Sequence, residues 1–145
     1  MVVDVVTKIE ISRPREEVAA FAADPAKATA WYKNIEASEW ETRPPVGVGS
    51  RFRFRARFLG RTLDYTYQVQ EIEPGTRIVM ATTQGPFPMQ TTYIWEDAAD
   101  GATRMTLRNT GEPSGFAAVT APVMTRAMRK ANAADLRRLK ALLER

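Results

Sequence analysis

The segment that spans residues 51–58 alternates strictly between arginine and apolar side chains. It reads RFRFRARF, with arginine at each odd position and phenylalanine or alanine at each even one. Successive side chains of a β-strand point to opposite faces of the sheet, so this pattern predicts a strand with one apolar face and one solvated face. A sheet built from such strands has a single inner face.

Six further segments are rich in β-branched and aromatic residues and predict strands, most of them by alternation. They are Val2–Ile11, Ser38–Arg43, the segment from Leu63 to the turn at Pro74-Gly75, Arg77–Thr83, Met89–Glu96 and Thr103–Asn109. Turn residues separate the later strands, namely Pro44-Pro45, Gly60, Pro74-Gly75, Gly85-Pro86 and Asp100-Gly101. Because these turns are short, we expect an antiparallel meander.

Helices are expected at two places. Start signals at Pro14 and at Asp24-Pro25 predict two short helices after the first strand, the first over Pro14–Ala23. An apolar stripe with helical spacing predicts a long helix over Ser114–Arg145, in which Pro122 should kink or delay the first turns. Runs of strands closed by one helix favour a single α+β domain over residues 1–145, with the helix on one face of a curved antiparallel sheet.

Cysteine and histidine are both absent from the chain. The first absence excludes disulfides, thiolate nucleophiles and cysteine metal sites. The second removes the commonest general base and the usual zinc ligand. There is also no glycine-rich phosphate loop and no metal-ligand spacing. We therefore expect no cofactor and no metal.

The net charge of +4 and the isoelectric point near 9.7 raise the question of a nucleic-acid partner. Strict alternation places the arginines of residues 51–57 on the outer sheet face, near Asp64 and Glu71 and away from aromatic side chains that would stack on bases. We expect a solvated face and no nucleic acid. An alternative is that this basic face docks an acidic partner protein.

No apolar run approaches the length of about 18 residues that a membrane span needs. The N-terminus carries an acidic residue inside its apolar stretch and no cleavage-like site. We therefore expect a cytoplasmic protein without a membrane span. The sequence leaves monomer and homodimer open.

The predicted order of elements is a strand, two short helices, six strands and a long helix. This order and several segments of the sequence resemble the START-like SRPBCC family, and more narrowly its polyketide cyclase/dehydrase-type branch. The segments are VTKIEISRPREEVAAFAADPAKATAWY, GSRFRF, VQEIEPGTRIVM, WEDAADGATRMTLRNTGEP and ANAADLRRLKALLER. The resemblance implies a helix-grip fold with a deep hydrophobic cavity between the sheet and the last helix. It leaves the activity open, because the family includes lipid carriers, hormone receptors, ubiquinone-binding proteins, aromatase/cyclases and chaperone activators.

The strand parities and this resemblance together predict a cavity wall for a hydrophobic ligand such as a lipid, quinone or polyketide. Aromatic rings and methionine side chains suit flat or irregular apolar ligands, although the same residues could simply fill the core. Phe87 and Met89 are expected near the mouth, as a gate or as a rigid turn. The predicted wall comprises Trp31, Phe54, Phe58, Tyr65, Tyr67, Thr82, Phe87, Met89, Thr91, Tyr93, Trp95, Met105, Phe116, Met124 and Met128.

The alternative is a polyketide cyclase/dehydrase-type enzyme. Such an enzyme needs a base beside a ketone and a donor for the enolate oxygen. Candidate donors are the hydroxyls of Tyr65, Tyr67 and Tyr93, and Arg108 would join them if a bulge turned it inward. The sequence offers no evident base, so a binding cavity is preferred to an active site.

Overall fold

One antiparallel sheet with the strand order β1-β7-β6-β5-β4-β3-β2 forms the frame of the protein. The computed structural model describes residues 3–85, 87–112 and 121–145. The strands are β1 (Val3–Ile11), β2 (Ile35–Trp40), β3 (Arg51–Phe58), β4 (Arg61–Glu73), β5 (Arg77–Gln84), β6 (Met89–Asp97) and β7 (Thr103–Gly111). Consecutive strands from β2 to β7 pair with each other, and β1 closes the order against β7. The predicted antiparallel meander is confirmed.

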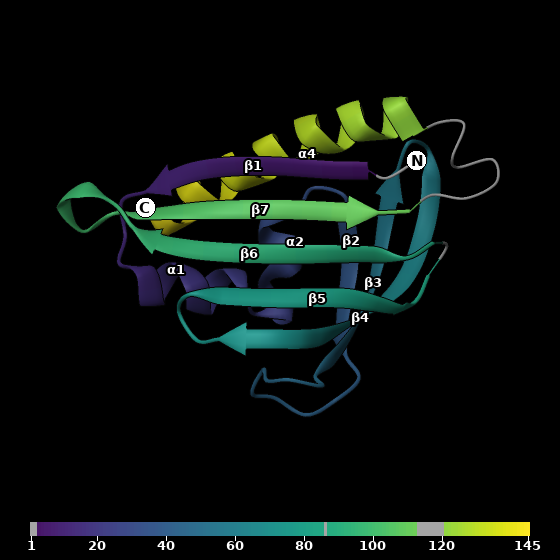
Figure 1. The fold of residues 1–145 in the computed structure, drawn as a ribbon, viewed down its shortest axis with the longest axis horizontal. Helices are drawn as coiled ribbons and strands as arrows, with labels where there is room; N and C mark the ends of the chain where they lie inside the picture. Colours follow the sequence, from purple (N-terminus) through teal and green to yellow (C-terminus); the bar gives the residue numbers. More distant parts are fainter. Residues whose placement is uncertain (1–2, 86, 113–120) are drawn as a thin grey trace.

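The helices lie on one side of this sheet, as Figure 1 shows. Between β1 and β2 the chain forms α1 (Arg15–Ala22), the 3-10 turn Pro25–Lys27 and α2 (Ala28–Trp31). Asp24 caps the 3-10 turn, since its carboxylate accepts a hydrogen bond from the Ala26 amide at 2.9 Å. The long helix α4 spans Ala121–Leu143. The α+β helix-grip architecture is therefore confirmed.

The sheet bends sharply within β4. The pairing of β4 with β5 shifts register between Thr66 and Tyr67 and again between Val69 and Glu71. Such irregularities bend a strand and increase its twist. In Figure 1, β2 and β3 accordingly stand almost upright while β1, β7, β6 and β5 run across the view. The sheet thus curls around the helices on its inner face.

The core fills only part of the space inside the curl. Leu136 and Leu139 of α4 belong to one buried cluster with Ile11, Met105 and Trp31. A smaller cluster joins the first turns of α4 to the start of β1, through Ala121 and Met124 against Val3 and Val5. The middle of α4 lies between these clusters and faces the cavity described below.

Some predicted boundaries differ from the structure. The strand predicted over Ser38–Arg43 is β2, Ile35–Trp40, because a bulge between Ile35 and Ala37 interrupts the alternation that the prediction followed. The strand predicted from Leu63 to the turn at Pro74-Gly75 begins two residues earlier, at Arg61, since the turn before it contains only Leu59 and Gly60. Residues 114–120 of the predicted last helix lie outside the described residues, and Pro122 occupies the first turn of α4.

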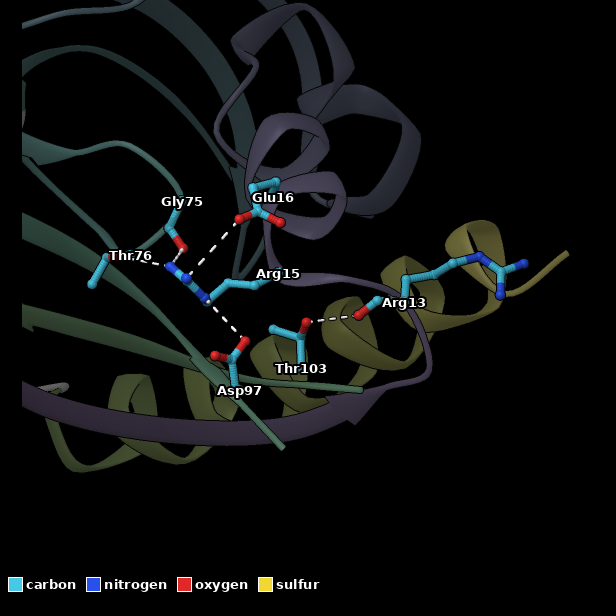
Figure 2. Close-up of polar contacts among 7 residues, drawn as sticks. All are labelled: Arg13, Arg15, Glu16, Gly75, Thr76, Asp97 and Thr103. Carbon is cyan, nitrogen blue, oxygen red and sulfur yellow. Dashed lines mark hydrogen bonds and ion pairs between the residues drawn. The ribbon is translucent and has the colours of Figure 1, made fainter. Parts of the chain in front are cut away.

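The start of α1 is fastened to the adjacent end of the sheet by Arg15 (Figure 2). Its Nη1 atom donates to the Gly75 carbonyl and to the Thr76 hydroxyl, both at 2.9 Å, and its Nε atom donates to Asp97 at 3.1 Å. Nearby, the Thr103 hydroxyl donates to the Arg13 carbonyl at 2.7 Å. One side chain therefore ties α1 to the β4–β5 turn and to the end of β6.

We predict that Arg15→Met destabilises the protein by about 1–3 kcal/mol, because it leaves several acceptors without their donor while keeping most of the apolar stem. Urea denaturation measures this free energy of unfolding. Arg53→Met on the exposed outer face is the matched control and should change it by less than about 0.5 kcal/mol. Equal effects of the two substitutions would contradict the assigned role of Arg15.

Candidate functional site

An apolar cavity of about 640 Å³ lies between the curled sheet and α4. Its wall comes from β3, β4 and β6, from the segment around α2, and from one face of α4. Small-molecule sites have volumes of roughly 300–1,000 Å³, so the cavity is large enough for a ligand. Along α4 it extends from Val123 to Asp135. At a rise of about 1.5 Å per residue this is a length of about 18 Å.

The alternation in β3 and β4 builds the largest part of this wall. Even-numbered residues of β3 and the odd-numbered residues of β4 from Leu63 to Val69 point inward, and the register places Phe54 opposite Tyr65 and Ala56 opposite Leu63. The rings of Phe54 and Tyr65 lie 5.6 Å apart between centroids. Such cross-strand pairs hold the aromatic side chains in place. The inner wall is therefore set by strand register.

The structure brings most of the predicted wall residues together. Those that line the cavity are Phe54, Phe58, Tyr65, Tyr67, Phe87, Met89, Thr91, Tyr93, Met124 and Met128. Phe52, Leu63 and Met80 also line it, although they were not among the predicted residues. Phe116 lies outside the described residues.

Four predicted wall residues do not line the cavity. Trp31, Trp95 and Met105 are almost completely buried in the main core cluster, where they fill the closed end of the fold. The Thr82 hydroxyl accepts a hydrogen bond from the Met89 amide at 3.0 Å and so serves the pairing near the β5–β6 turn. Parity gave the three strand residues among them, Thr82, Trp95 and Met105, the correct sheet face, but parity does not determine where a core ends and a cavity begins.

Arg108 faces outward, and the hypothesis that a bulge turns it inward is wrong. The pairing of β7 with β1 and β6 runs through Arg108 without a register shift. Its guanidinium donates to both carboxylate oxygens of Asp4, at 3.0 and 2.7 Å, which lowers the pKa of Asp4. Arg108 therefore has no access to the cavity.

The arginines of β3 also face outward, as the alternation predicts. Arg51, Arg55 and Arg57 each lie within ion-pair distance of an acidic neighbour, Glu41, Asp64 and Glu36 respectively. Exposed pairs of this kind contribute little to stability. They do reduce the positive charge that the outer face presents to a partner.

One tyrosine hydroxyl of the wall is satisfied within the protein. The Tyr67 hydroxyl forms a hydrogen bond of 2.7 Å with the Thr91 hydroxyl, which in turn donates to Oδ1 of Asn109 at 2.7 Å. Burial raises the pKa of Tyr67 to about 12, so the phenol stays neutral at physiological pH. These hydrogen bonds anchor the wall and use both hydroxyl hydrogens, so neither hydroxyl is left to donate to a ligand.

A second cluster of polar side chains lies at the closed end of the cavity, and the sequence analysis predicted only its Tyr93. It comprises Tyr32, Tyr93, Asn132 and Asp135, which all line the cavity. The hydroxyls of Tyr32 and Tyr93 are hydrogen-bonded to each other. Asn132 and Asp135 lie three residues apart on α4 and are only 5% and 2% exposed. We call these four residues the polar end. The available signal was an amide and a carboxylate within the apolar stripe of the last helix.

The Asp135 carboxylate is held in place by two donors. Its Oδ1 atom accepts hydrogen bonds from the Lys33 amide at 3.1 Å and from Nη1 of Arg138 at 3.2 Å. The same Arg138 atom donates to the Trp31 carbonyl at 2.7 Å. Burial raises the pKa of Asp135 above its ordinary value, while the amide and the guanidinium oppose that rise. The cavity thus contains an ionisable carboxylate.

The opposite end of the cavity is bordered by exposed apolar side chains. Leu59 and Val123 are 51% and 61% exposed, and both line the cavity. Leu59 has a φ of 51°, a left-handed conformation that is uncommon for a bulky residue. These two residues define the side of the cavity that opens to solvent.

No described helix is long and apolar enough to cross a membrane. Within the described ranges, there is also no group of three or more acidic side chains placed to hold a metal ion.

Solved structures of the same fold are numerous. A protein from Thermus thermophilus, TTHA0849, is 21% identical, with a TM-score of 0.82 over 95% of this chain and 94% of that one. The Zhui aromatase/cyclase from Streptomyces sp. R1128 is 17% identical, with a TM-score of 0.80 over 100% and 95% of the two chains. A START superfamily protein from Mycobacterium smegmatis is 14% identical, with a TM-score of 0.80 over 97% of each. At these identities the likeness establishes the fold alone.

A search of curated proteins gave no match. The family described as polyketide cyclase / dehydrase and lipid transport, however, matches residues 2–144, which is nearly the whole chain. Because the match covers nearly the whole chain, this protein belongs to that polyketide cyclase/dehydrase and lipid-transport family, and it shares its helix-grip fold with the START superfamily protein described above.

Proposed function

We propose that this protein binds a hydrophobic small molecule, such as a lipid, a quinone or a polyketide, in the cavity between α4 and the sheet. The observation that carries the proposal is an apolar volume of about 640 Å³ lined mainly by aromatic and methionine side chains. Apolar ligands gain free energy when they leave water for such a surface.

The size of the cavity limits the ligand. Water occupies about 30 Å³ per molecule in the liquid, so the volume corresponds to about twenty water molecules. A ligand of roughly twenty non-hydrogen atoms fits this space. The length of about 18 Å along α4 favours an elongated molecule.

In this proposal the ligand enters the cavity from its open side, past Leu59 and Val123. An apolar molecule would contact these exposed side chains before it reached the inner wall. Phe87 and Met89, predicted as a gate, also line the cavity and lie on the β5–β6 connection and the start of β6. The family description, which includes lipid transport, is consistent with this route.

We predict that Ala56→Phe weakens binding of a lipophilic probe by at least about tenfold. Ala56 lies on the inner face of β3 between Phe54 and Phe58, so a larger side chain there occupies the ligand's space. Fluorescence titration with a panel of lipophilic ligands, followed through tyrosine and tryptophan emission, measures the affinity.

Ala37→Phe is the matched control, because Ala37 is exposed on β2 and does not line the cavity. It should leave the affinity unchanged. If no ligand of the panel gives a saturable signal with the wild-type chain, or if both substitutions weaken binding equally, the cavity is not the binding site.

A second candidate is an enzyme of the polyketide cyclase type, and Asp135 is the observation that favours it. The carboxylate is a base within the cavity wall, and its pKa is raised by burial toward the range in which a base is effective near neutral pH. Asp135 would take a proton from the carbon between two ketones. The Tyr93 hydroxyl would donate a hydrogen bond to the resulting enolate oxygen. The enolate carbon would then attack a second carbonyl, whose C=O π bond opens to an alkoxide, and the alkoxide would take up the proton held by Asp135.

For this candidate, Asp135→Asn should reduce turnover of a poly-β-ketone analogue by about 10²-fold or more, and Tyr93→Phe by a similar factor. The rate should rise with pH through a pKa above the ordinary carboxyl range, because only the ionised carboxylate accepts the proton. Arg108→Lys, on the outer face, is the control. No turnover by the wild-type chain, or turnover that survives Asp135→Asn, would contradict the proposed mechanism.

A further inference from the structure

The polar end has hydrogen-bonding capacity that its own residues do not use. The Nδ2 atom of Asn132 is buried and has no hydrogen-bond partner among the described residues. The tyrosine pair uses one hydroxyl hydrogen between its two oxygens and so leaves the other for a further acceptor. Buried polar groups normally have partners. The polar end is therefore incomplete without a polar atom from elsewhere.

Asp135 contributes an acceptor to the same place. Both hydrogen bonds that the described residues donate to this carboxylate end on Oδ1, from the Lys33 amide and from Arg138. Two such donors favour the ionised form, which accepts up to about four hydrogen bonds. Oδ2 is thus available to accept a hydrogen bond from a group inside the cavity.

We infer that the polar end binds a neutral hydroxyl group at the end of an apolar ligand and disfavours a carboxylate there. A hydroxyl donates one hydrogen bond and accepts others, so it matches Oδ2 of Asp135 on one side and the Asn132 amide or a tyrosine hydroxyl on the other. The amide of Asn132 can turn about its last side-chain torsion and present its NH₂ group to that oxygen. This inference rests on the proposed cavity function and names the chemistry of its ligand.

A carboxylate fits this place poorly. It only accepts hydrogen bonds, and its charge would lie close to that of Asp135 in a region of low dielectric constant. The cation nearest to that carboxylate, Arg138, is already shared between Oδ1 of Asp135 and the Trp31 carbonyl and does not line the cavity. The basic residue that does line the described wall is Arg61, beside the hairpin turn at Leu59 and Gly60 on the open side.

The test is displacement of the neutral fluorescent probe N-phenyl-1-naphthylamine from the full chain by 1-decanol and by decanoate at pH 7.5. Asn132→Leu should weaken the binding of 1-decanol by about tenfold relative to that of decanoate, because it removes one donor to the hydroxyl oxygen. Asp135→Asn should strengthen the binding of decanoate by about tenfold relative to that of 1-decanol, because it removes the repelling charge and keeps the shape of the side chain. The ratio of the 1-decanol affinity to the decanoate affinity is compared between each variant and the wild type, so the different water solubilities of the two ligands cancel.

Gln90→Leu and Asp64→Asn likewise replace an amide by leucine and a carboxylate by an amide, but at exposed positions on the outer face. Each should leave the ratio of the 1-decanol affinity to the decanoate affinity unchanged. Probe affinity shows that each variant retains a folded cavity. If the probe does not bind the wild-type chain, the cavity function itself fails. If the probe binds but the ratio of decanol to decanoate is the same in the wild type and both polar-end variants, the hydroxyl subsite is wrong while the cavity function stands.

Discussion

A single helix cannot cover the inner face of a seven-stranded sheet. Neighbouring strands lie about 4.8 Å apart, so seven of them span roughly 29 Å, whereas a helix with its side chains is about 10 Å across. The alternation in the strands nevertheless gives the whole sheet one apolar face. Bending at the irregularities of β4 brings that face around α4, and the space that α4 does not fill becomes the cavity.

The position of the cavity follows from how α4 is held. Leu136 and Leu139 pack into the main core, and Ala121 and Met124 pack against the start of β1. Between these anchors, Met128, Ala131 and Asn132 line the cavity. The helix is thereby fixed at both ends of the cavity, so the cavity wall does not depend on a ligand to support α4. Asn132 and Asp135 lie where the cavity meets the core, and Leu59 and Val123 lie on its open side.

Sequence patterns predicted the sheet and much of the wall because alternation is a local property. The inward positions of Phe54, Tyr65 and Tyr93 follow directly from it. The limits of the core do not, since Trp95 and Met105 share the inward face but lie under the C-terminal half of α4. The polar end was missed for a similar reason. Asn132 and Asp135 are ordinary residues of a helix in sequence, and only the tertiary fold buries them beside Tyr32 and Tyr93.

A crystal structure of the protein grown with N-phenyl-1-naphthylamine tests most directly whether the space between α4 and the sheet is a binding cavity. The account predicts electron density for the rings between Phe54 of β3 and Met128 of α4, with the frame of the sheet unchanged. Side chains of α4 and β3 that meet across this space, with the probe absent or bound only at the outer surface, would contradict it.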